Sequence, residues 1–271
     1  KAEDAALEAL SECLECVTST SGLVAAAVGF VEGQLGGWPH TAPVQCKRWL
    51  LHMPKLLWML QDKDPKLSLK IITTLTALAK RAAVYPQAEK DIGELQPMLV
   101  PFFRSCVKKN GQLLYKAGPF SKLPANCQSS ALTLVYYLAP LSEALLSAMA
   151  AVAALPEVTA ATLDRAMDVV GMLADSGRQS ASSCVSFITT CAVVASSDGD
   201  SSDGDPASEG EDARGLEVAK MAARQLRGRH FVRAVPELVQ PLISRLVSRA
   251  KSSAHELRCA IVLAEATGGW A

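Results

Sequence analysis

Apolar residues recur at helical spacing along most of this chain, in short stripes separated by polar breaks. One stripe within residues 65–82 consists of Leu67, Ile71, Leu75, Leu78 and Ala82. A shorter apolar face before it consists of Leu56, Leu57 and Leu60. Between the two, the polar residues 62–64 and Pro65 end one helix and start the next, since proline suits the first turn of a helix. The pattern predicts two antiparallel helices joined by a tight turn.

The hairpin over residues 53–82 is similar to a HEAT repeat, with an early proline in its first helix, an aspartate at the turn and a basic residue in its second helix. The same order returns over residues 235–267, where Pro236 opens one helix and His255 opens another. Pro54 and Pro236 lie about four repeats apart if each repeat has the roughly 40–47 residues typical of HEAT and armadillo proteins. The chain is therefore expected to be an array of related helix pairs.

Further stripes fill the interval between these two hairpins. One consists of Leu163, Met167, Val170 and Leu173, and the next of Cys184, Phe187, Ile188, Cys191 and Val194. Gly177 between them predicts a helix stop. Helices are also expected over 124–138, 141–154, 5–17 and 23–35. Each helix would bury one stripe against a neighbour, which is the logic of a stacked array.

These stripes predict an all-α fold, a HEAT/armadillo-like α-solenoid of antiparallel helix pairs without a sheet of three or more strands. At least two thirds of the residues outside 196–213 should be helical. The residues expected in the core are Leu57, Leu60, Ile71, Leu75, Leu78, Val170, Leu173, Phe187 and Cys191.

Composition also favours helices over strands. Hydrophobic residues make up 49% of the 271 residues but aromatic residues only 5%, so Ala, Leu and Val carry the apolar content. Lys plus Arg and Asp plus Glu number 27 each, so overall charge predicts neither a nucleic-acid binder nor a membrane-surface protein. We expect no transmembrane span or signal peptide, and the first residue, which is not Met, suggests a fragment of a longer protein. The eight cysteines are expected to be buried free thiols in a reducing compartment.

Residues 196–213 interrupt the helical pattern. They include seven acidic residues and no side chain more apolar than Ala, which predicts a disordered acidic loop. Residues 213–271 carry the opposite charge, with ten Lys or Arg against four Asp or Glu. We therefore expect a helical-repeat array over 1–195, the acidic loop over 196–213, and a C-terminal helical repeat with a basic surface over 214–271.

The basic cluster, defined as Arg224, Arg227, Arg229 and Arg233, is the densest group of cations in the chain. It is a candidate site for binding a partner or a phosphate, including an indirect contact with rRNA. A solvated helix end that balances the acidic loop explains it equally well. Within the loop, Ser197, Ser202 and Ser208 each precede an acidic residue by three positions, so they are candidate phosphorylation sites for an acidophilic kinase.

Catalytic and metal-binding motifs do not emerge from the sequence. Cys13 and Cys16 have CxxC spacing, but a closed zinc site needs four ligands and a second such pair is missing. His255 and Glu256 lack the second histidine of a zincin helix. The acidic loop does not keep the ligand spacing of an EF-hand. We therefore expect a protein that is not an enzyme, with no catalytic residue, cofactor or metal.

Three stretches resemble a known family: residues 56–82, 118–138 and 168–194. The most specific is the run Gly-Pro-Phe-Ser-Lys-Leu-Pro over residues 118–124, followed by a helix containing Tyr136 and Tyr137. Together they resemble the C-terminal part of plant-type members of the testis-expressed-protein-ten/Ipi family of pre-rRNA-processing proteins. The resemblance spans about residues 50–195.

The resemblance implies a non-enzymatic scaffold subunit of a nuclear Rix-type complex that acts in maturation of the large ribosomal subunit. It implies a nucleolar or nucleoplasmic protein, with a helical-repeat subunit and a WD-repeat subunit of a pre-ribosomal complex as partners. Two alternatives remain, because a fold alone does not assign a function. One is a HEAT-type transport-receptor or cargo-adaptor scaffold, and the other is a regulatory subunit of an enzyme.

Overall fold

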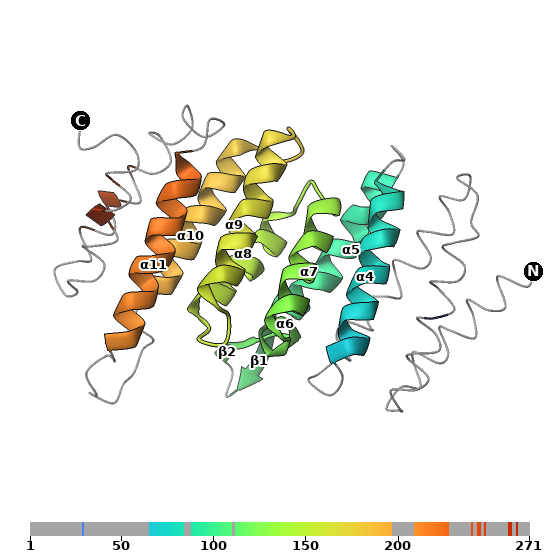
Figure 1. The fold of residues 1–271 in the computed structure, drawn as a ribbon, viewed down its shortest axis with the longest axis horizontal. Coiled ribbons are helices and arrows are strands. Elements are labelled where there is room, and N and C mark those ends of the chain that lie inside the picture. The colour runs from blue at the N-terminus through green and yellow to red at the C-terminus, as the bar shows by residue number, and fades with distance from the viewer. Residues whose placement is uncertain are drawn as a thin grey trace, which may run out of the picture. The chain divides into compact units, whose positions relative to one another are not determined.

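The computed structural model describes residues 65–83, 88–109, 112–196 and 209–227, together with a few single positions outside these ranges. Most of these ranges are helical (Figure 1). The helices are α4 (Pro65–Ala82), α5 (Ala88–Phe103), α6 (Pro119–Lys122), α7 (Ala125–Tyr137), α8 (Glu143–Ala151), the 3₁₀ helix η1 (Val152–Ala154), α9 (Ala160–Asp175), α10 (Ala181–Ser196) and α11 (Glu209–Leu226). The strands are β1 (Arg104–Lys109) and β2 (Gln112–Ala117). The helices expected before residue 65 and after residue 227 lie outside the described residues.

Helix α4 forms where the apolar stripe of residues 65–82 was expected. Its buried residues include Leu67, Ile71, Leu75 and Leu78. Between them, Thr73 is exposed and its hydroxyl donates to the Leu69 carbonyl at 2.8 Å, so it stays within its own helix. Lys80 and Arg81 occupy the last turn, where the helix dipole favours cations. Burial of each large apolar side chain stabilises the fold by about 1.5–3 kcal/mol.

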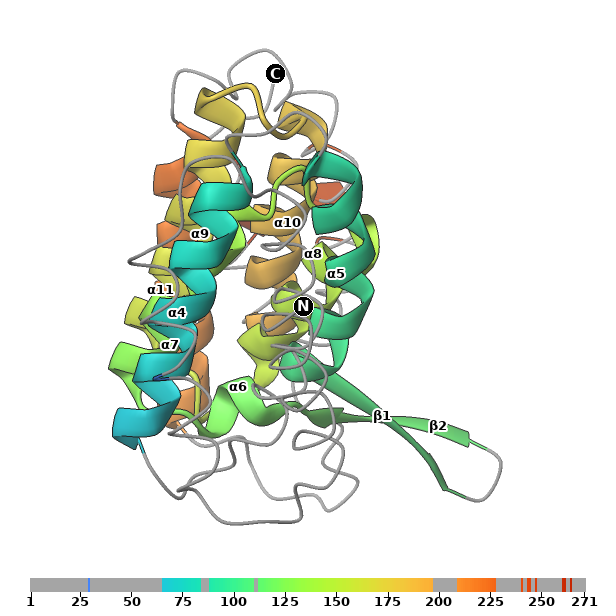
Figure 2. The same cartoon turned by 90° about the vertical axis from the view of Figure 1, so that its right-hand side faces the viewer.

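By its internal contacts the chain divides into two compact units, Lys1–Leu145 and Leu146–Ala271. Within the first unit, α4 packs against α7, and α5 lies in a second layer, as Figures 1 and 2 show. Helix α5 also packs against α6 and against the start of β1. This two-layer arrangement of antiparallel helices is the one expected of a solenoid.

A buried glutamine fixes one of the turns of the first unit. Gln96 on α5 is 2% exposed, and its Nε2 donates to the carbonyls of Leu138 at 2.8 Å and Pro140 at 2.6 Å. Its Oε1 accepts the backbone N–H of Ser142 at 2.6 Å. One buried side chain therefore joins three backbone groups of the connection between α7 and α8 and is itself fully hydrogen-bonded there.

Within the second unit, α10 packs against α9, α11 and η1. Figure 1 shows α9, α10 and α11 side by side, in alternating directions. Helix α9 ends at Asp175, and Gly177 follows with φ of 68°. The Arg178 N–H reaches back to the Leu173 carbonyl at 2.9 Å, which closes the helix end as a left-handed C-terminal cap does. The predicted helix stop at Gly177 is confirmed.

The predicted fold class is confirmed: the chain is an α-solenoid of antiparallel helix pairs. Seven of the expected core residues are buried, with relative exposures of 3% or less: Ile71, Leu75, Leu78, Val170, Leu173, Phe187 and Cys191. Leu57 and Leu60 lie outside the described residues. Helix α11 begins at Glu209, within the segment 196–213 expected to be a loop, so the acidic segment between α10 and α11 is shorter than predicted. The division of the chain into three regions otherwise stays a prediction.

One element was not expected from the sequence. β1 and β2 form a two-stranded antiparallel hairpin in which Arg104 lies opposite Ala117 and Lys109 opposite Gln112. This register leaves two residues, Asn110 and Gly111, between the strands, and Asn-Gly is the dipeptide that two-residue hairpin loops favour. Local turn chemistry therefore interrupts the helical array at this place. Among the described residues, this sheet has two strands only.

Candidate partner-binding surface

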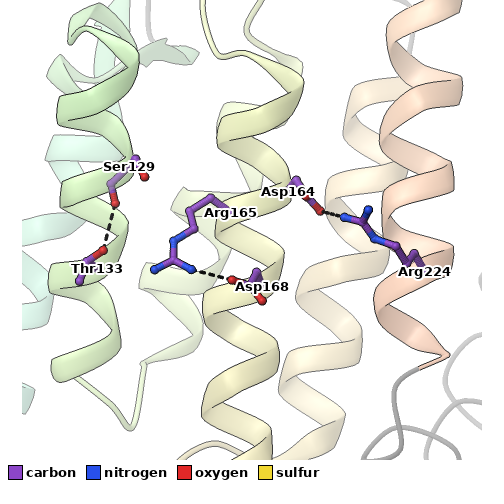
Figure 3. Close-up of polar contacts among 6 residues, drawn as sticks. All are labelled: Ser129, Thr133, Asp164, Arg165, Asp168 and Arg224. Carbon is purple, nitrogen blue, oxygen red and sulfur yellow. Dashed lines mark hydrogen bonds and ion pairs between the residues drawn. The ribbon is translucent and has the colours of Figure 1, made fainter.

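The structure describes two of the four members of the basic cluster. Arg224 lies on the exposed side of α11, and Arg227 follows the end of that helix and is also exposed. Arg224 donates to the Asp164 carboxylate on α9 at 2.5 Å (Figure 3). Arg229 and Arg233 lie outside the described residues.

Charged residues of α9 continue this polar surface. Arg165 pairs with Asp168 at 2.6 Å, one turn along the same helix (Figure 3). The hydrogen bond that Arg224 donates to Asp164 and the charge of that carboxylate raise the pKa of Arg224, and the charge of Asp168 adds to the effect. Asp164 and Asp168 each face one arginine, which offsets the repulsion between like charges four positions apart on a helix.

This pairing limits what the basic cluster can bind. Arg224 is committed to a carboxylate of the same chain, yet its side chain is 65% exposed. An exposed ion pair contributes little to stability, because water competes for both partners. A phosphate or acidic side chain that approaches Arg224 must therefore share the guanidinium with Asp164. The assignment of the cluster as a binding site stays a prediction.

Arg214 of the basic segment has a different role, which the sequence pattern did not indicate. It is half-buried on α11 and donates to the carbonyls of Ala153 at 3.2 Å and Val158 at 2.7 Å. Burial lowers its pKa, while the charge of Glu157 acts in the opposite direction. Its Nε is buried without a hydrogen-bond partner among the described residues. Arg214 therefore holds the connection from η1 to α9 in place rather than facing a partner.

The candidate phosphorylation sites Ser197, Ser202 and Ser208 lie outside the described residues. Ser208 immediately precedes α11, and Ser197 immediately follows α10. Both therefore flank packed helices in the sequence. Their modification stays a prediction.

The run over residues 118–124 that is specific to the resembled family builds the core of the first unit. The backbone N–H of Gly118 donates to the Phe103 carbonyl at 3.0 Å, where the chain returns from β2. A Cβ at position 118 would lie 2.3 Å from the Phe102 carbonyl oxygen, so only glycine fits there. Phe120 packs edge-on against Phe102, with ring centroids 5.8 Å apart, and lies 4.9 Å from Phe103. The run is thus structural, because it closes the base of the hairpin.

Thiol chemistry is disfavoured at the buried cysteines that the structure describes. Burial raises the pKa of Cys191 to about 12, and burial together with the charge of Asp175 raises the pKa of Cys184 to about 12. Burial also raises the pKa of Cys127. A neutral thiol is a poor nucleophile and a poor metal ligand. These residues contribute packing instead.

Within the described ranges, no three His, Cys, Asp or Glu side chains gather closely enough to hold a metal ion. Of the helices that the structure describes, none combines the length and apolarity needed to cross a bilayer.

Stacked antiparallel helices with charged outer faces define a helical-repeat protein of the scaffold type. A family model described as TEX10-like, TPR repeats matches residues 45–201, and the chain belongs to this TEX10-like family. The match covers the region in which the family resemblance was recognised, so that recognition is confirmed. The family description calls the repeats TPR, and their HEAT or armadillo character stays a prediction. No curated protein matches the chain.

Proposed function

We propose that this chain is a non-enzymatic scaffold subunit of a nuclear Rix-type complex that acts in maturation of the large ribosomal subunit. The observation that supports this proposal is the TEX10-like family match over residues 45–201, which lies on a solenoid of antiparallel helices. Solenoids present extended surfaces to other macromolecules, and each repeat contacts mainly its neighbours. Such a surface suits an assembly factor that must hold several partners at once.

The proposal includes the partners and the compartment. A helical-repeat subunit and a WD-repeat subunit would bind the solenoid, with indirect contact to rRNA, and the protein would work in the nucleolus or nucleoplasm. We assign the repeats to the HEAT or armadillo type on the basis of the proline and basic positions of residues 53–82. Proteins of both types, like TPR proteins, are binding scaffolds.

Affinity purification of the tagged full-length protein from its own cells, followed by quantitative mass spectrometry, tests this function. We expect precursors of the large ribosomal subunit to co-purify with a WD-repeat protein and a second helical-repeat protein. A fluorescent fusion should accumulate in the nucleus. Recovery of Ran or nucleoporins without ribosomal precursors would instead assign a transport receptor. A single kinase or phosphatase would assign a regulatory subunit.

Two substitutions separate loss of the solenoid from loss of a contact. Leu75→Asp places a charge at a 1% exposed position of α4 and should abolish both the fold and the co-purification. Thr73→Asp, two residues away at an exposed position of the same helix, adds the same charge and should leave both unchanged. If Leu75→Asp retained the ribosomal precursors, the solenoid would not carry the interaction.

A further inference from the structure

The β1–β2 hairpin lies outside the packed helices of the first unit (Figure 2). Its two six-residue strands contact each other and the end of α5, and Figure 2 shows the ribbon extending away from the helices of its unit. A two-stranded hairpin is only marginally stable in water by itself. It also leaves one edge of each strand without a neighbouring strand among the described residues. Such an edge is a template for pairing with another chain.

The base of the hairpin is held firmly, so the strands emerge from a fixed place. Phe103 and Phe120 are each 1% exposed and pack together directly before β1 and after β2. The Gly118 N–H donates to the Phe103 carbonyl, which joins the two ends of the hairpin. A rigid base lowers the conformational entropy lost when a partner binds, because the strands are already positioned.

The composition of the strands indicates what they would bind. Residues 105–116 contain three lysines, Lys108, Lys109 and Lys116, and no acidic residue. By register, Cys106 lies opposite Tyr115 and Val107 opposite Leu114, so two consecutive apolar pairs are flanked on each side by a pair that contains a lysine. An extended chain that carries both acidic residues and β-branched or aromatic ones complements both properties. Its backbone would pair with the open edge, and its carboxylates would meet the lysines.

We propose that the hairpin of residues 104–117 is a docking strand for an extended, acidic segment of another protein, bound by addition of a strand to its edge. Nucleic acid fits less well, because base stacking needs aromatic side chains and Tyr115 is the only one in the hairpin. A second copy of the chain would bring like charges together. The acidic segment after α10 is rich in Gly, Ser and Asp, which strands disfavour.

This docking role goes beyond the proposed function, because it requires no ribosomal component. A labelled peptide of alternating Glu and Val or Ile, eight residues long, is a defined probe. Its diastereomer with alternating D and L residues has the same charge and composition but cannot form a regular strand. We expect the full chain to bind the first peptide at least tenfold more tightly than the second, measured by fluorescence anisotropy.

Charge-reversal variants locate the binding. Lys108→Glu/Lys109→Glu should weaken binding of the all-L peptide at least tenfold. Lys80→Glu/Lys122→Glu changes the net charge equally at two exposed positions outside the hairpin and should change the affinity less than threefold. Replacement of residues 105–116 by Gly-Asn-Gly should abolish binding and leave the helical circular dichroism and the melting midpoint unchanged, because the replaced residues lie outside the helices.

Each other outcome overturns the proposal. Equal binding of both peptides would reduce the interaction to charge alone. Tighter binding of oligouridine than of the peptide, lost with Lys108→Glu/Lys109→Glu, would assign the hairpin to nucleic acid. An unchanged peptide affinity in the hairpin variants would show that the hairpin is not the binding site. The ribosomal co-purification tests the proposed function separately and does not depend on this result.

Discussion

At the scale of single residues, one close contact of this fold depends on the absence of a side chain. Gly118 faces the Phe102 carbonyl with no room for a Cβ, whereas Gly93 on α5 has open space around it. Both are glycines in the same unit, and sequence alone does not distinguish them. The difference arises from where the chain passes itself at the base of the hairpin.

Gly118→Ala is therefore expected to destabilise the protein by about 1–3 kcal/mol or more, since the clashing atom belongs to the backbone and cannot turn away. Gly93→Ala is the matched control. It adds the same methyl group to an exposed helical position, where it should stabilise the protein by about 0.5–1 kcal/mol. Urea unfolding of both variants measures the two effects, and equal stabilities would contradict the close contact at Gly118.

The buried thiol of Cys191 predicts a dependence of stability on pH. Its pKa is raised from 9.0 to about 12 by burial, so the folded state retains a proton that the unfolded state loses. The contribution of the protonated thiol to the free energy of unfolding is complete below pH 9. It is lost as the pH rises from 9 towards 12, because the unfolded state is then deprotonated while the folded state is not. The slope is at most about 1.4 kcal/mol per pH unit. The unfolding free energy of the native protein should fall faster between pH 9 and 10.5 than that of Cys191→Ala, and parallel curves would show that the thiol is not buried.

Residue-scale reasoning from the sequence located the core but not the polar contacts. Leu75 and Val170 belong to stripes whose period reveals their burial. The pairing of Arg224 with Asp164 joins residues that are 60 positions apart, and no local pattern encodes it. The sequence pattern shows Arg214 only as a positive charge, whereas its hydrogen bonds to the carbonyls of Ala153 and Val158 give it a structural role.

At the scale of elements, the sequence predicts helices that have a clear apolar stripe, such as α4. It does not predict the start of α11 or the β1–β2 hairpin. The acidic composition of residues 209–212 argues against a buried core but permits a helix, and α11 begins there. The hairpin carries the Asn-Gly dipeptide at residues 110–111, but its apolar residues lack the strict alternation that identifies a strand. The boundaries of helices and strands therefore depend on tertiary contacts, which cannot be derived from composition.

The position of α11 sharpens a test of the basic cluster. Residues 198–208 can be deleted without touching α11, and this removes four acidic residues near Arg224 and Arg227 in the sequence. If the cluster binds phosphates, the deletion should tighten binding of a single-stranded rRNA fragment about two- to tenfold at low salt, because less negative charge competes for it. Ser197→Asp/Ser202→Asp/Ser208→Asp should weaken binding. Identical affinities for both variants across a salt series would leave the cluster as a solvated surface.

At the scale of the whole molecule, the solenoid architecture could be predicted because its signal repeats. Several short helices, each with one apolar stripe, require neighbours, and stacking is the arrangement that supplies them. The partners of such an array could not be derived from its periodicity, because the stripes describe inward faces. The family match identifies a helical-repeat scaffold, and the partners of that scaffold stay a proposal.

Stacking also predicts how the molecule responds to a cut. Helix α11 packs against α9 and α10 and buries Val218, Ala219, Ala222 and Leu226. A site-specific protease sequence inserted after Asp203 should therefore allow cleavage without dissociation. The two fragments are expected to elute together in gel filtration and to separate in urea. Mass spectrometry of each fraction identifies the fragments. Separation without urea would mean that this packing does not hold α11 in place.

Helix α10 has a consequence for the synthesis of the chain. It contains no charged residue, and it is covered by α11, which ends 30 residues later. At a translation rate of roughly 5–20 residues per second, the apolar side of α10 waits about 2–6 s for its cover to be made. The acidic residues Asp198, Asp200, Asp203 and Asp205 are made directly after α10, where charge opposes aggregation of a nascent apolar segment. The acidic segment would then protect the nascent chain from aggregation before any partner binds.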